Sequence, residues 1–325
     1  MYTDFSERDK AALRHNCGDI FMSALNNPDI IEIMLNPDGK LWIERYGQEQ
    51  EPLGLISREQ ATLIISMVAS SLNVPVSYKS PIVEGEFPLD GSRFEGIFPP
   101  IVSPGPAFSL RKKASKVFSL RDYVVAGTMR EEVIEIIRAA VADRKNILVV
   151  GGTSSGKTTF VNAVIEEISK ITPDDRLLIL EDTAELQSKS KNCVFMRTSN
   201  IPGAEVNLRA LAKVCMRCAP KRIIIGEVRD LAALELLKLW NTGHPGGVGT
   251  FHADSAEDAL PRLEELVEEA GFGSKQSLIG RAVDLIVYME KNRRNQRQLS
   301  SIIQVNSYDK RSGQYDTEVV YAARL

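Results

Sequence analysis

The spacing of apolar residues divides the chain into two stretches with different patterns. In the first stretch, Ile30–Leu35 and Leu41–Arg45 flank an Asn-Pro-Asp-Gly turn, which is typical of a β-hairpin. Apolar residues recur at helical spacing within Ala61–Tyr78, and the Pro- and Gly-rich segment Pro81–Pro106 suits short strands and turns. We therefore predict a smaller α+β domain with an antiparallel sheet over residues 1–110.

The second stretch alternates short apolar runs with helical stripes. The runs are Asn146–Val150, Leu177–Leu180, Ile223–Ile225, Val248–Phe251 and Leu285–Tyr288. Strands that are apolar on both sides are typical of a mostly parallel sheet covered by helices on both faces. We predict an α/β domain over residues 129–325, joined to the first by a linker at 111–128 that contains a basic run.

The end of the chain predicts a hairpin whose strands include Ile302–Val305 and Val319–Tyr321. A basic cluster precedes these strands and consists of Lys291, Arg293, Arg294 and Arg297. We interpret this cluster as a hairpin loop rather than a nucleic-acid site, because most basic runs of this size are solvated.

The composition limits the classes of function. A net charge of −3 does not favour a protein that coats nucleic acid or anionic membrane, and 6% aromatic residues do not favour a platform for stacking single-stranded bases. The first ten residues mix acids and bases, which is not typical of a secretory signal. The uncharged window Ala61–Tyr78 is too polar to span a bilayer, and the pair Cys215 and Cys218 lacks the further ligands of a zinc site.

One motif is highly specific for phosphate binding. It matches G-x-x-x-x-G-K-[ST] at every fixed position and consists of Gly151, Gly152, Thr153, Ser154, Ser155, Gly156, Lys157 and Thr158, followed by Thr159. This P-loop lies between an apolar strand and an amphipathic helix, so backbone N–H groups and the helix N-terminus can surround phosphate oxygens. We expect Lys157 to reach the β- and γ-phosphates and the Thr158 hydroxyl to bind Mg²⁺. ATP is the expected nucleotide, because the chain lacks the N/T-K-x-D motif of guanine-specific proteins.

Three further segments place acids or histidines beside predicted strands. Glu181 and Glu185 follow one strand, where a carboxylate can orient an attacking water or simply cap a turn. Glu227 follows an apolar strand and one glycine, a variant of the acid that binds Mg²⁺ or its water in P-loop proteins. His244 and His252 lie in a Gly-rich segment, which favours sensing of the γ-phosphate over zinc binding.

Taken together, these four segments resemble the type II/IV secretion ATPases, in the order P-loop, LEDTAEL, IIIGEVRD and NTGHPGGVGTFHAD. The last segment is most similar to the TrbB type of conjugal-transfer ATPase of type IV secretion systems, although Asp254 stands where such proteins usually carry Asn. The resemblance covers about residues 30–320 and implies a PAS-like N-terminal domain and a RecA-like P-loop NTPase C-terminal domain. It also implies ATP-driven motion between the domains that powers pilus assembly or translocation of DNA or protein.

The resemblance also assigns roles to residues. Glu185 matches the catalytic glutamate and Glu227 the glutamate of the Walker B segment, while Glu181 and Asp182 in the same segment as Glu185 could share the catalytic role. Arg93 and Arg111 match arginines that reach the γ-phosphate from the N-terminal domain. Arg217 is a possible further nucleotide contact, although it also fits an ordinary basic helix face.

The expected partners follow from the same resemblance. They are further copies of the chain in a hexameric ring and the inner-membrane components of a secretion or conjugation channel. The expected location is cytoplasmic, peripheral on the cytoplasmic face of the inner membrane, with no sequence-specific nucleic-acid binding. Two alternatives stay open: a helicase-like nucleic-acid motor, and an assembly scaffold that binds ATP without appreciable turnover.

Overall fold

The structure, a computed structural model, divides into two compact units. The first unit ends at residue 115, and the second begins at residue 116. The described residues are 5–45, 48–113, 117–199, 205–228, 232–269, 273, 275–292 and 296–323.

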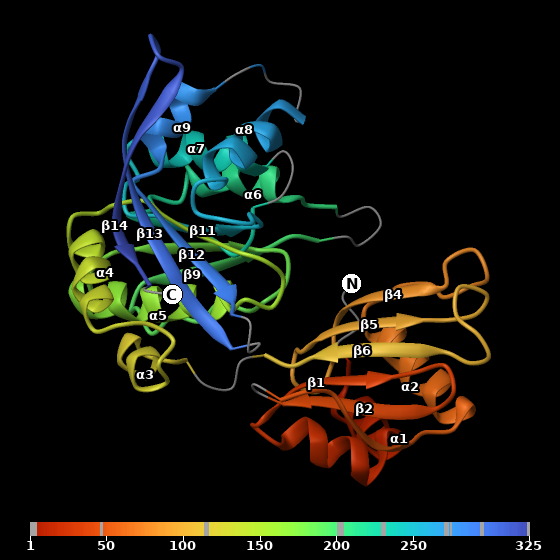
Figure 1. Ribbon diagram of the computed structural model, residues 1–325. Helices are drawn as coiled ribbons and strands as arrows, with labels where there is room; N and C mark the ends of the chain where they lie inside the picture. Colours follow the sequence, from red (N-terminus) through yellow and green to blue (C-terminus); the bar gives the residue numbers. More distant parts are fainter. Residues whose placement is uncertain are drawn as a thin grey trace. The chain divides into compact units, whose positions relative to one another are not determined.

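The first unit is an α+β fold with a one-sided antiparallel sheet (Figure 1). Its described helices are α1 (Glu7–Asn26) and α2 (Arg58–Ser71). Its strands are β1 (Ile30–Leu35), β2 (Lys40–Arg45), β3 (Glu51–Leu55), β4 (Ile82–Glu86), β5 (Arg93–Ile97) and β6 (Ala107–Arg111). They pair in the order β3-β2-β1-β6-β5-β4, and the predicted hairpin is β1 with β2.

Alternating apolar residues explain why one face of this sheet is buried. Ile33 and Leu35 on β1 and Leu41 and Ile43 on β2 are at most 2% exposed, whereas the intervening Trp42 is only half-buried. The buried face packs on residues of α1 and α2 in a single apolar cluster that includes four phenylalanines, Phe21, Phe87, Phe94 and Phe108.

The second unit is built on an eight-stranded mixed sheet. Its strands are β7 (Ile147–Val150), β8 (Leu177–Glu181), β9 (Cys193–Arg197), β10 (Arg222–Ile225), β11 (Val248–Phe251), β12 (Leu285–Lys291), β13 (Arg297–Asp309) and β14 (Gln314–Ala322). The order is β14-β13-β12-β7-β11-β10-β8-β9. The six strands from β12 to β9 are parallel, and β13 and β14 add an antiparallel hairpin at one edge, as the sequence predicts.

Helices cover both faces of this sheet (Figure 1). They are α3 (Leu120–Val125), α4 (Glu132–Ala142), α5 (Lys157–Ile171), α6 (Leu208–Cys215), α7 (Ala232–Asn241), α8 (Ala259–Glu269) and α9 (Gln276–Ala282). Ile147 and Val149 face the core formed with α3, α4 and α5, while Leu148 and Val150 face the core formed with α6 to α9. The predicted α/β architecture, with a parallel sheet covered on both faces, is therefore confirmed.

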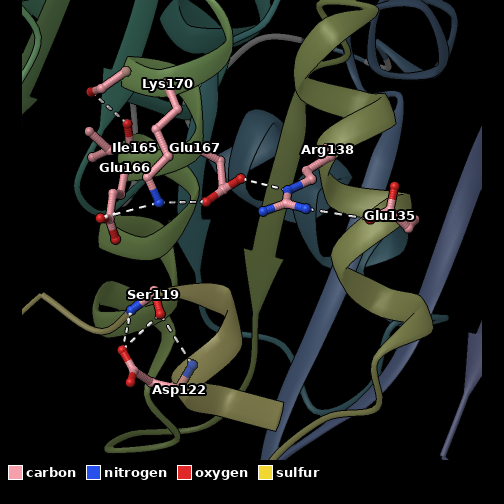
Figure 2. Close-up of polar contacts among 9 residues, drawn as sticks. Ser119, Asp122, Glu135, Arg138, Ile165, Glu166, Glu167 and Lys170 are labelled. Atoms are coloured by element: carbon pink, nitrogen blue, oxygen red, sulfur yellow. Dashed lines mark hydrogen bonds and ion pairs between the residues drawn. The ribbon is translucent and has the colours of Figure 1, made fainter.

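The segment predicted as a linker contains regular structure. Arg111 is the last residue of β6, and α3 lies within residues 111–128 with Leu120 and Tyr123 in the core of the second unit. Ser119 caps α3, because its Oγ accepts a hydrogen bond from the Asp122 backbone N–H at 3.2 Å (Figure 2).

A buried carboxylate joins α4 to α5. The Arg138 Nε donates to Glu167 Oε2 at 2.8 Å, and the Lys170 Nζ donates to Glu167 Oε1 at 2.9 Å (Figure 2). Burial opposes ionisation of Glu167, but the hydrogen bonds from Arg138 and Lys170 prevail and lower its pKa. This pairing fixes α5, the helix that follows the P-loop, against its neighbour.

Arg222 is a fully buried arginine at the start of β10. Its Nε donates to Asp175 Oδ2 at 2.7 Å, and its Nη atoms donate to the Gly246 carbonyl at 3.2 Å and the Val141 carbonyl at 2.9 Å. Asp175 also accepts from Arg144 at 2.6 Å. Burial raises the pKa of Asp175, but hydrogen bonds from Arg144 and Arg222 outweigh it and lower the pKa. The network joins the ends of α4 and α5 to the loop before β11.

In the part of the chain that the structure describes, none of the helices combines the length and the apolar character needed to cross a membrane.

We predict that Arg222→Ala lowers the free energy of unfolding by about 3 kcal/mol, because it leaves Asp175 and two backbone carbonyls buried without this partner. Arg130→Ala is the matched control, since Arg130 pairs with Glu132 at the surface over 3.8 Å and should change stability by less than about 1 kcal/mol. Urea denaturation measures both.

The difference between wild type and Arg222→Ala should also depend on pH. The folded-state pKa of Asp175 is lowered, so its stabilising contribution is complete above the unfolded-state pKa and is lost as the pH falls through the folded-state value. The difference should therefore shrink in acid, and a difference that grows in acid would contradict the assignment.

Candidate functional site

Four parallel strands end at the same edge of the second sheet. The P-loop follows β7, His252 follows β11, Glu227 lies two residues beyond β10, and Glu181 is the last residue of β8. These strands are neighbours in the order β7-β11-β10-β8. Ligands of open α/β sheets bind at the carboxyl ends of the strands, so this edge is the candidate site.

The P-loop has a backbone that few residues other than glycine adopt. Gly151 and Gly156 have φ values of 149° and 99°, and Ser154 is left-handed at 59°. A Cβ at Gly151 would lie 1.9 Å from the Met289 carbonyl oxygen. Gly156 is the N-cap of α5 and supplies no side-chain cap, which leaves the first N–H groups of the helix for an anion.

Lys157 is buried, and its ammonium group is held inside the loop. The Lys157 Nζ donates to the carbonyls of Gly151 and Gly152, at 2.8 Å each, and lies 3.4 Å from His252 Nδ1. The His252 Nε2 lies 2.9 Å from Glu227 Oε1. A lysine can only donate, so His252 Nδ1 is the acceptor in its contact with Lys157, while the other ring nitrogen faces the Glu227 carboxylate. One imidazole therefore connects the P-loop lysine to the carboxylate beyond β10.

Glu181 holds the turn that carries Glu185. Its Oε1 accepts hydrogen bonds from the backbone N–H groups of Glu185 at 2.9 Å and Leu186 at 2.7 Å. Glu181 is 2% exposed, and burial raises its pKa despite those two hydrogen bonds. On α5, Asn162 accepts from the Gln187 N–H at 2.8 Å and donates to the Glu185 carbonyl at 3.1 Å.

The hydrogen bonds that hold this turn involve the backbone of Glu185 and not its carboxylate. It is half-buried and forms no hydrogen bond or ion pair with the residues described. The turn thus fixes the backbone of Glu185 and leaves its carboxylate available to bind water.

Close packing against Glu181 explains why a glycine, Gly226, precedes Glu227. A Cβ at Gly226 would lie 3.2 Å from Glu181 Cγ, closer than most side-chain contacts allow. The Gly226 N–H donates to the Leu180 carbonyl at 2.9 Å, and its own carbonyl accepts from Thr250 Oγ1 at 2.7 Å. The glycine therefore lets the two acidic segments approach each other.

Two expected site residues lie elsewhere in the unit. His244 precedes β11 whereas His252 follows it, so His244 lies at the opposite edge of the sheet from the P-loop. Arg217 lies in the exposed turn after α6, next to Cys218, whose carbonyl accepts from Arg176 before β8, so this turn also lies at the opposite edge. The structure brings His252, but neither His244 nor Arg217, to the P-loop of its own chain.

Arg93 and Arg111 belong to the first unit. They lie directly opposite each other on β5 and β6, and Arg93 Nη2 is 3.7 Å from Glu84 Oε1. On the neighbouring strands, Glu86 lies opposite Arg93 and Glu32 lies opposite Arg111. Their contact with the γ-phosphate stays a prediction.

Two residues that hold the site, Asn162 and Arg297, were not predicted from the sequence. Asn162 has no place in the sequence prediction, and the basic cluster that contains Arg297 is predicted to be a hairpin loop. The Arg297 Nε donates to the Ser154 carbonyl in the P-loop at 3.2 Å, across 143 residues of sequence. Such a contact leaves no periodicity or spacing that could have revealed it. Arg229, Arg293 and Arg294 lie outside the described residues.

The donors present fit Mg²⁺ bound together with a nucleotide. Thr158 offers a hydroxyl in the first turn of α5, and Glu227 offers a carboxylate. Magnesium prefers oxygen ligands and is usually held by one or two carboxylates plus phosphate oxygens rather than by a cage of protein side chains. Among the described residues no group of three or more His, Cys, Asp or Glu side chains could hold a metal ion.

The chain is similar to known proteins along most of its length. The model of the family "Type II/IV secretion system protein" matches residues 16–315. "Probable conjugal transfer protein TrbB" of Sinorhizobium fredii is 48% identical over 306 residues, covering 94% of this chain and 92% of that protein. "Type IV secretion system protein VirB11" of Bartonella henselae is 27% identical over 310 residues, covering 82% and 86%.

A solved structure shows the same fold. The X-ray structure of the Legionella pneumophila ATPase DotB matches with a TM-score of 0.60 at 17% identity, over 89% of this chain and 80% of that one. The predicted fold class, a RecA-like P-loop domain with a smaller α+β (PAS-like) N-terminal domain, is confirmed.

We predict that Gly151→Ala destabilises the nucleotide-free protein, because the new methyl group would collide with the Met289 carbonyl. Gly152→Ala is the matched control, since a Cβ there would meet nothing within 4 Å. Thermal unfolding without nucleotide should show a clear loss for the first variant and little change for the second. Equal melting temperatures for both variants would contradict the described loop geometry.

Proposed function

We propose that this chain, which belongs to the type II/IV secretion system protein family, is a Mg²⁺-dependent ATP hydrolase of a conjugal-transfer apparatus. The observation that carries the proposal is the convergence of the P-loop, His252, Glu227 and Glu185 at one sheet edge. Hydrolysis would drive motion between the two domains and power pilus assembly or translocation of DNA or protein.

The P-loop would bind the phosphates. The N–H groups at the start of α5 lack side-chain caps, and the buried Lys157 brings a positive charge to the same place. The Lys157 ammonium group donates to the carbonyls of Gly151 and Gly152 and lies beside His252 Nδ1. A phosphate is a stronger partner for an ammonium group than a carbonyl, so the lysine would exchange those contacts for phosphate oxygens.

Glu181 at the end of β8 and Glu185 in the turn that follows would have different roles. We assign general-base action, the orientation and deprotonation of the attacking water, to Glu185 because its carboxylate has no partner among the described groups. Glu181 is a positioning residue, because both backbone N–H groups of the turn depend on its Oε1. A bound Mg²⁺ would neutralise phosphate charge, with Thr158 and Glu227 as its protein ligands.

Positive charge for the transition state would come from outside the P-loop edge. Arg93 and Arg111 of the first unit are the proposed donors, and closure of that unit would couple their arrival to hydrolysis. Arg217 and His244 lie at the opposite edge of the sheet, where a neighbouring copy in a hexameric ring could use them. The proposed place of action is the cytoplasmic face of the inner membrane, in contact with the channel proteins there.

We predict that Lys157→Ala abolishes measurable binding of MgATP and therefore turnover, because it removes the buried ammonium group that would bind the phosphates. Lys170→Ala on the same helix is the control, since its ammonium group pairs with Glu166 and Glu167 away from the loop. Titration calorimetry measures binding. Wild-type affinity in Lys157→Ala would remove the basis for the proposed site.

We predict that Glu185→Gln lowers kcat by at least about 100-fold while ATP still binds, because the general base is lost. Glu181→Gln should keep kcat within about tenfold of wild type, since its amide oxygen can still accept both backbone N–H groups. Single-turnover phosphate release separates binding from chemistry. If the two variants lost activity in the reverse order, Glu181 would be the base.

A further inference from the structure

We propose that Arg297 is a positioning residue of the P-loop: from the hairpin of β12 and β13, it fixes the left-handed turn at Ser154 and so sets the affinity for nucleotide phosphates. The inference rests on the proposed function, because it concerns the same phosphate site.

The contact is direct and directional. Arg297 is the first residue of β13, and its Nε donates to the Ser154 carbonyl at 3.2 Å. The side chain is half-buried, and its two Nη atoms have no hydrogen-bond partner among the described residues. One nitrogen of the guanidinium group is therefore committed to the P-loop backbone, while the rest of its charge stays beside the loop.

Ser154 is the position in the loop where such support matters. Its φ of 59° is left-handed, a conformation that is unfavourable for a residue with a side chain because the Cβ crowds the following carbonyl oxygen. Alternation of left- and right-handed residues is what turns successive N–H groups toward one anion. A hydrogen bond to the Ser154 carbonyl offsets the cost of the turn before any nucleotide arrives.

The same hairpin supports the loop at its other special positions. A Cβ added at Gly151 would lie 1.9 Å from the Met289 carbonyl oxygen on β12. A Cβ added at Gly156 would lie 3.2 Å from the Arg297 Cδ on β13. Three residues with unusual φ values, Gly151, Ser154 and Gly156, thus contact β12 or β13. The β12–β13 hairpin therefore supports the P-loop at each of these three residues.

Charge alone does not distinguish Arg297 from its neighbour. Lys291 lies directly opposite Arg297 in the β12–β13 register, and it is exposed. Both residues carry one positive charge beside the turn that joins β12 to β13. Of the two, Arg297 alone has a hydrogen bond to the P-loop. Lys291 is therefore a matched control that removes the same charge without removing the contact.

The test compares Arg297→Gln, Arg297→Lys and Lys291→Gln in the full chain. Calorimetry with MgADP and MgATP at about 0.15 M salt should show that Arg297→Gln weakens both nucleotides by the same factor, roughly tenfold, as expected for one lost hydrogen bond to a charged group. Its kcat at saturating ATP should stay within about threefold of wild type, because the contact serves ground state and transition state alike. Lys291→Gln should bind like wild type, and Arg297→Lys should remain weakened because it lacks the Nε donor.

A second measurement needs no nucleotide. Hydrogen exchange of the backbone amides at 153–157 should be faster in nucleotide-free Arg297→Gln than in wild type or Lys291→Gln. Unchanged exchange overturns the inference, even if wild type proves not to bind ATP and the proposed function itself fails. Arg297→Lys with wild-type affinity, or equal weakening by Lys291→Gln, would show that charge alone acts. A much larger loss for MgATP than for MgADP would place Arg297 on the terminal phosphate and also overturn the positioning role.

Discussion

Parallel pairing of β7, β11, β10 and β8 is the constraint on which the site depends. Each strand is only four or five residues long, and each delivers one component to the same edge: a phosphate-binding loop, an imidazole, or a carboxylate. A strand running the other way would carry its group to the far edge, about 13 Å away for four residues. His244 and His252 belong to the same sequence motif, but His244 precedes β11 and His252 follows it. The direction of β11 therefore places the two histidines at opposite ends of the strand.

Acidic residues at this edge have separate tasks because their surroundings differ. Glu181 is buried and satisfies two backbone N–H groups, so it organises a turn. Glu227 lies beside an imidazole, and Glu185 is left without a described partner. Gly226 permits the close approach, because any side chain at that position would press on Glu181. Gly226, the unusual residue in the segment after β10, is thus needed because Glu181 of the neighbouring strand β8 packs against it.

Much of the architecture could be predicted from the sequence, because buried parallel strands and the P-loop carry strong local patterns. The hairpin of β1 and β2, the strands β7, β8, β10, β11 and β12, and the terminal hairpin lie where the apolar runs place them. The helix α1 and the edge strand β9 were not anticipated: Gly18 interrupts α1 with a φ of 73°, and β9 has no fully buried residue. The support given by Asn162 and Arg297 depends on tertiary contacts, which have no signature along the chain.

The buried Arg222 has a consequence for how this unit can transmit force. It holds the far end of α5, through Asp175 just beyond the helix, to the end of α4 and to Gly246. The bond between Glu167 and Arg138 holds α5 to α4 at a second point along the helix. We therefore expect α5 to keep its position rather than slide along its axis. If the proposed hydrolysis displaces the P-loop, the motion would pass first to the turn after β8, which Asn162 contacts near the start of α5, and to the β12–β13 hairpin, which contacts the loop through Arg297.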